Sequence, residues 1–390
     1  MAIKKNDILY FLLILLILSQ FCYPFRDIFP KALTLFCGII FIFSIFLYEH
    51  RNKTFLLLVG FNIFIFLRII FSGNYSFNYF APINIGIRFF LLLEGYSIYL
   101  FLKRYQNINR KRIKYLMSII KISLIIDILI SFYYINFLSP TLIRNASRYK
   151  LLGLGDFELM YALSFCLVAF WAVKEKKKMF FMITFIFFGL IILKSNIVTS
   201  CVIYILAILL CIVFNFEKKQ KFILLNIGIL FLLFFQIIKK ILVEILKELS
   251  QSDFFYFAMK KKIIAVSNLL QGDFSNIDTL NLRYKLILRS LNTFKENLLL
   301  GVNYKEVRAG VIGGHAGWFD LLAQFGIFGC FIIIILLYKI YKEQLDGVRS
   351  IKRKNAIKIG WLLFIILGFL NPHLMGAVIY SMFILIPFIF

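Results

Sequence analysis

Long apolar runs alternate with short polar segments along most of this chain. Runs of about 17–25 apolar residues with few charges are typical of transmembrane helices, because the hydrocarbon core of a bilayer is roughly 30 Å thick. Twelve such runs lie near residues 8–24, 32–48, 54–71, 82–102, 115–138, 154–173, 179–194, 197–216, 222–238, 318–340, 357–371 and 374–390. The pattern predicts an all-α, polytopic integral membrane protein with about 12 transmembrane helices.

One polar segment, 239–317, is far longer than the others and precedes the last three runs. Long loops of this kind are usually functional. Its start has apolar residues at helical spacing between lysines and glutamates, a pattern typical of an amphipathic helix at the membrane surface; these residues are Ile241, Ile245 and Leu249. A second amphipathic helix is expected further on, with an apolar stripe formed by Tyr284, Ile287 and Leu291.

The charge pattern predicts how the chain is oriented. The formal net charge is +26, and basic residues gather in every second loop, near residues 4–5, 51–53, 103–114, 174–178, 218–221 and 339–358. Basic residues favour cytoplasmic loops, so both termini are expected in the cytoplasm and 239–317 outside it. The charge is therefore interpreted as a topology signal, and no nucleic acid partner is expected.

The chain shows no internal repeat and no linker rich in proline or serine. We therefore expect a single polytopic membrane domain over 1–390, with 239–317 as one large extracytoplasmic loop that carries short amphipathic helices.

Candidate chemistry is concentrated in this loop and at the start of the next run. Arg283 and Arg289 lie just outside the membrane, where a guanidinium group matches phosphate oxygens and stays charged. For Arg289 the alternative is a solvated surface helix. His315 follows two glycines and titrates near neutrality, although a structural histidine at the interface is the alternative. Asp320 enters the next apolar run, where a carboxylate is costly enough to suggest a function.

Two further arginines belong with this group. Arg88 lies several residues inside an apolar run, and Arg148 lies in an outward segment, so both are candidates to surround an anion with Arg283. Arg68 lies near the end of its run and is interpreted as snorkelling to the interface.

Several chemistries have no motif in this chain. There is no DxD motif, P-loop, HExxH, GxSxG or CxxC, and the six cysteines fall within or beside apolar runs without metal-ligand spacing. A cytosolic sugar-nucleotide transferase or an ATP-driven transporter is therefore not expected. We predict no cofactor and no metal site.

The order R…l…f…n-l-G…H…l-D-l-A…G-i-G is formed here by Arg283, Asn297, Gly301, His315, Asp320, Gly326 and Gly329. It resembles the signature of bacterial O-antigen and capsular polysaccharide polymerases (Wzy-type), which belong to the O-antigen polymerase/ligase superfamily. The residue match covers about fifty positions, and the expected topology extends the resemblance to the whole chain.

The resemblance implies a glycosyltransferase of the bacterial cytoplasmic (inner) membrane. Such enzymes polymerise undecaprenyl-pyrophosphate-linked oligosaccharide repeat units at the outer face of that membrane, without metal or nucleotide. Their expected partners are this glycolipid, the lipid bilayer, a chain-length regulator and other glycan-assembly membrane proteins.

The resemblance also implies roles for individual residues. His315 would activate or orient the acceptor hydroxyl, and Asp320 would tune that site or bind sugar hydroxyls. The lipid pyrophosphate would be held by arginines, namely Arg283, Arg148, Arg88 and Arg289.

Two other functions remain open at this stage. An O-antigen ligase, which transfers finished glycan to an acceptor, would need the same groups. A flippase or transporter of lipid-linked oligosaccharides is less favoured, because its usual repeats and broken midplane helices are not evident in the sequence.

Overall fold

The computed structural model describes residues 2–73, 82–138, 154–173, 178–195, 197–215, 235–252, 257–271, 278–307 and 311–389. All regular elements in these ranges are helical, and no β-strand occurs among them. The predicted all-α class is therefore confirmed.

The elements follow one another as α1 (Ala2–Phe21), α2 (Tyr23–Ile28), α3 (Lys31–Glu49), α4 (Lys53–Ser72), α5 (Pro82–Ile108), α6 (Arg110–Tyr133), the π-turn η1 (Tyr134–Leu138), α9 (Phe157–Ala172), α10 (Lys178–Lys194), α11 (Val198–Asn215), α13 (Phe235–Gln251), α14 (Phe257–Gln271), α15 (Asp278–Glu296), the 3-10 turn η2 (Tyr304–Glu306), α16 (Gly317–Asp346), α17 (Ile351–Leu370), α18 (Gly376–Tyr380), η3 (Ser381–Leu385) and α19 (Ile386–Phe388).

Six helices in the described part of the chain are long and apolar enough to cross a membrane: α3, α4, α5, α6 with η1, α11 and α16. Helices also occupy the other predicted runs except 222–238, most of which lies outside the described residues. Some are short: α9 and α10 have 16 and 17 residues, or about 24–26 Å at 1.5 Å per residue. The structure is that of a helical membrane protein, and twelve spans remain a prediction.

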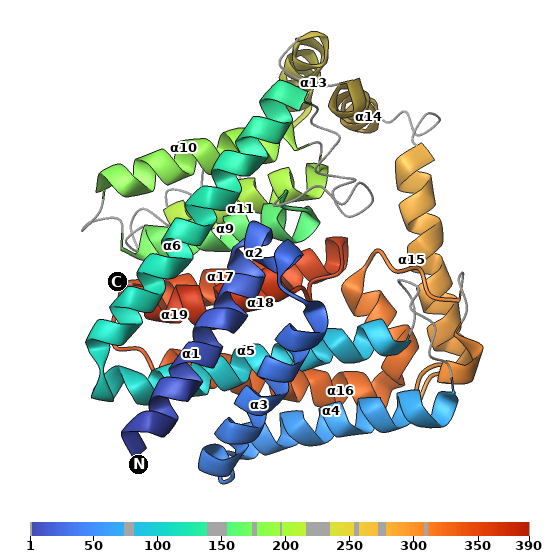
Figure 1. Cartoon of the computed structure of the whole chain (residues 1–390). Coiled ribbons are helices and arrows are strands. Elements are labelled where there is room, and N and C mark those ends of the chain that lie inside the picture. The colour runs from blue at the N-terminus through green and yellow to red at the C-terminus, as the bar shows by residue number, and fades with distance from the viewer. Residues whose placement is uncertain are drawn as a thin grey trace.

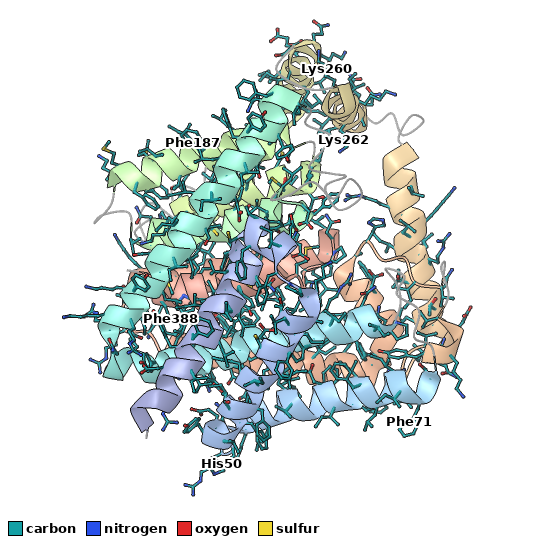
Figure 2. The ribbon with its side chains drawn as sticks, viewed as in Figure 1. His50, Phe71, Phe187, Lys260, Lys262 and Phe388 are labelled. Carbon is teal, nitrogen blue, oxygen red and sulfur yellow. The ribbon has the colours of Figure 1, made fainter. Side chains whose placement is uncertain are left out.

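The helices are arranged with the two termini on one side of the molecule and the late loop helices on another (Figure 1). Both the N- and C-terminus lie at the left of the view, while α13 and α14 lie at the top and α15 at the right. Helices α4, α5 and α16 run across the view, and α15 lies crosswise to them. His50 lies near the turn between α3 and α4, and Phe71 lies at the far end of α4 (Figure 2).

Helix α9 is central to the packing. It is apolar on all sides, and every residue from Leu159 to Trp171 is buried. A helix without a polar face is stable only inside a protein or a membrane. Helices α10, α11, α17 and α18 all pack against it.

The expected amphipathic helix at the start of the late loop is present as α13. Ile241, Ile245 and Leu249 are exposed, while Val243 is buried and α13 packs against α14. Lys260 of α14 lies near the edge of the molecule (Figure 2).

The second amphipathic helix is also present, as α15, and none of the three residues of its predicted apolar stripe is fully buried. Tyr284 is 61% exposed, whereas Ser290 and Thr293 are buried. Small polar residues form the buried side because α15 packs closely on α16 and hydrogen-bonds to the segment before it.

Helix α16 is broken at Gly326, which has φ 61° and ψ −165°. The segment between α15 and η2 fills the break. Ile327 N–H donates to the Leu298 carbonyl (2.8 Å), and Val302 N–H donates to the Ala323 carbonyl (2.9 Å). Residues 327–346 alone extend about 30 Å, enough to cross a bilayer. The helical turns before the break, with Asp320, therefore need not enter the hydrocarbon.

Arg68 of α4 stabilises this break. Its guanidinium donates to the Gln324 carbonyl (3.2 Å) and the Val302 carbonyl (2.9 Å), and it lies 4.2 Å from the ring centre of Tyr304. Carbonyls released from a helix need new donors where water is scarce. The interpretation of Arg68 as a snorkelling side chain is therefore corrected: it binds the backbone of the broken helix.

Candidate functional site

Asp320, in the first turn of α16, is buried and accepts three hydrogen bonds. Its Oδ1 accepts from the Ser290 hydroxyl (2.7 Å) and from Gly314 N–H (3.0 Å), and its Oδ2 accepts from Ala316 N–H (3.3 Å). Those two N–H groups lie on either side of His315 in the chain. The carboxylate thus fixes the backbone that carries this histidine.

The segment before His315 is anchored to α15. Gly313 N–H donates to the Ser290 hydroxyl (2.9 Å), so this one side chain serves both the loop and α16. A Cβ at position 313 would collide with the Leu286 carbonyl. Gly314 has φ 78°, a left-handed conformation that favours glycine. The two glycines therefore let the loop lie against α15.

His315 is exposed, in contrast to the buried glycines around it. Partial desolvation lowers the pKa of its imidazole, the nearby charge of Arg283 lowers it further, and Asp320 opposes both effects. Because its ordinary pKa is about 6.5, the ring is neutral at pH 7. A neutral, exposed imidazole can accept a proton.

Arg283 is the arginine that the structure brings to His315. It lies exposed on α15, with both terminal nitrogens 3.5 Å from the hydroxyl of Thr199 at the start of α11. Contacts of that length are weak. Arg289 is also exposed on α15, but six positions along a helix correspond to a rotation of about 240°. It therefore lies on a different side of α15 from Arg283.

A second group of polar side chains lies around a cavity beside Asp320. Arg88, Asp320, Gln324 and His373 line a small cavity of about 20 Å³. Arg88 is half-buried on α5, and its charge acts on both Asp320 and His373. Asp320 therefore takes part in both groups, with His315 on one side and Arg88 on the other.

Arg148 lies outside the described residues. The prediction that Arg148 helps to surround an anion therefore rests on the sequence alone.

The sequence interpretation missed His373 and Ser290 as members of the site. His373 is one of three histidines in the chain and occurs in a short polar segment between two apolar runs, a signal that could have singled it out. Ser290 had no such signal, because its role depends on two hydrogen bonds to residues more than twenty positions away.

Together these groups can carry out a defined kind of chemistry. A neutral imidazole can take a proton from a hydroxyl group, and a permanent guanidinium charge beside it can stabilise a departing anion. Among the described residues, no three His, Cys, Asp or Glu side chains gather where they could hold a metal ion.

No family model, curated protein or solved structure matches this chain, so the function must be inferred from the residues and their geometry.

Proposed function

We propose that this protein polymerises undecaprenyl-pyrophosphate-linked oligosaccharide repeat units into O-antigen or capsular polysaccharide. The reaction takes place at the outer face of the bacterial cytoplasmic membrane. The acceptor hydroxyl of one glycan attacks the anomeric carbon of another, and the lipid pyrophosphate leaves. No nucleotide sugar is needed, because the pyrophosphate is itself the leaving group.

The observation that carries this proposal is the pairing of an exposed neutral histidine with an arginine beside it. His315 accepts the proton of the acceptor hydroxyl, and Arg283 stabilises the negative charge that grows on the pyrophosphate. Asp320 positions the histidine through the loop backbone. Arg148 is the further candidate for the pyrophosphate, whereas Arg88 lines the small cavity that also contains the Asp320 carboxylate. Arg289 is the weakest candidate because of its place on α15.

The arrangement of the helices supports the same proposal. The termini lie away from α15 (Figure 1), so cytoplasmic termini would put α15 and His315 on the outer side, where the lipid-linked glycan is presented. The break in α16 supports it too, because the span after Gly326 is complete without the site residues.

A ligase would use the same groups, since only the acceptor differs. The test is a reaction of the purified protein with lipid-linked repeat units isolated from a strain that lacks it. We expect longer lipid-linked glycans to form without added nucleotide sugar or ATP and in the presence of EDTA. Transfer that occurs only when a non-glycan-lipid acceptor is added would favour the ligase, and no transfer under either condition would contradict both.

A further inference from the structure

His373 is buried without a hydrogen-bond partner for its side chain. It is 1% exposed, in the turn between α17 and α18, and neither Nδ1 nor Nε2 has a partner among the described residues. A neutral imidazole has one donor and one acceptor nitrogen. Leaving such groups unpaired in a protein interior is unfavourable, so native structures rarely do so without a reason.

The position of this ring is closely determined. It packs against the indole of Trp318, with ring centres 4.0 Å apart, and edge-on against Phe364, with ring centres 4.6 Å apart. A Cβ at Gly317 or at Gly368 would collide with its Nδ1. Two helices therefore approach closely enough to hold the ring, and both need glycine to do so.

The surroundings keep the ring neutral. Burial, together with the charge of Arg88, lowers the pKa of His373 to about 3. This histidine therefore neither carries a charge at neutral pH nor acts as an effective base. What it offers is hydrogen bonding from a fixed position.

The cavity beside His373 restricts what can bind there. Its volume of about 20 Å³ is enough for one water-sized group and too small for a phosphate. The carboxylate of Asp320 lines the same cavity and disfavours an anion. A hydroxyl group fits both limits, because it can donate to an imidazole nitrogen and accept from a guanidinium.

We propose that His373 and Arg88 form a subsite that binds a sugar hydroxyl of the lipid-linked glycan. The inference rests on the proposed function, since it names how that substrate is positioned beside His315. Because Asp320 also holds the loop of His315, a hydroxyl bound in this cavity lies next to the reacting region. The alternative occupant is a fixed water molecule.

The first test uses the small number of histidines. With ring-¹⁵N histidine, the protein gives imidazole signals from only His50, His315 and His373, which the His50→Gln and His315→Gln variants assign by difference. We expect the His373 signal to shift when lipid-linked repeat unit from a deletion strain is added, and to stay unchanged with undecaprenyl pyrophosphate alone. A shift with both probes, or with neither while the same sample polymerises glycan, would overturn the subsite.

The second test is kinetic. His373→Phe keeps an aromatic ring beside Trp318 and removes both nitrogens, and His373→Gln keeps a polar group if the larger ring does not fit. We expect His373→Phe to raise KM for the glycolipid about tenfold, the loss expected for one hydrogen bond. His50→Phe, at the turn between α3 and α4, is the matched control and should leave KM unchanged.

The two proposals can fail separately. A shifted His373 signal in a protein that forms no polymer would contradict the proposed function and leave the subsite standing.

Discussion

At the scale of single residues, the sequence indicated the side chains that we propose as reacting groups, but not the contacts that position them. Arg283 and His315 were predicted from residue type and from their place in the polar loop, and the structure puts them close enough for the arginine charge to act on the imidazole. Asp320 was also predicted, but its contacts with the loop backbone could not be read from a five-residue spacing.

The pKa of His315 allows a direct test of this pairing. Removing the nearby positive charge in Arg283→Gln should raise the pKa of His315, because protonating the ring becomes easier. In the unchanged protein, activity should be retained at neutral pH and lost only as the pH falls through the lowered pKa of His315, below the ordinary range of an imidazole, because the base then becomes protonated. Imidazole NMR during a pH titration measures the pKa.

Arg289→Gln is the matched control, since it removes the same charge from another side of α15. An equal rise in both variants would mean that general surface charge, and not the position of Arg283, sets the pKa of His315.

At the scale of elements, apolar periodicity predicted most helices, whereas close packing decided their details. The side of α15 that faces its partners is formed by Ser290 and Thr293, and not by the expected apolar stripe. The break in α16 was not predicted either. In the sequence Gly326 was only one residue of a motif. The structure shows why glycine is needed there: a Cβ would collide with the Leu299 carbonyl.

The break provides the second prediction. Gly326→Ala adds a Cβ to a residue with φ 61° and should destabilise the protein by about 1–3 kcal/mol. Thermal unfolding in detergent measures the change. Gly60→Ala is the control, because no atom lies within 4 Å of a Cβ placed at that exposed helical position; it should be neutral or stabilising by about 0.5–1 kcal/mol. Equal stability of the two variants would argue against a strained break.

Helix α13 provides the third prediction. Ile245 and Lys247 are both exposed in the protein but lie about 200° apart around the helix. If α13 rests on a bilayer, a nitroxide at position 245 should be relaxed mainly by oxygen and one at position 247 mainly by a water-soluble nickel complex. Similar accessibility at both positions would mean that α13 does not lie at a membrane surface.

At the scale of the whole molecule, composition and run length were sufficient to predict a helical membrane protein. The number of spans was harder to predict, because helices of 16 or 17 residues do not by themselves decide between spanning and burial in the protein. The orientation in the membrane is inferred only from the alternation of basic loops, because contacts within the protein do not show which side of the membrane a loop faces.

Orientation can be tested with single cysteines. A cysteine at His50, in the turn between α3 and α4, should react with a membrane-impermeant maleimide only after the cells are opened. A cysteine at Lys247 of α13 should react in intact cells. Both positions are exposed in the protein, so a difference between them reports the side of the membrane. The reverse pattern would overturn the proposed topology.

The central claim is that His315 serves a polymerase at the outer membrane face. Its most direct test is the length of surface glycan on a gel, in a deletion strain that carries either the unchanged protein or His315→Ala at equal membrane levels. We predict single repeat units in the deletion strain, full-length glycan with the unchanged protein, and single repeat units again with His315→Ala. Full-length glycan with His315→Ala, or finished glycan that accumulates on its lipid carrier in the deletion strain, would contradict the account.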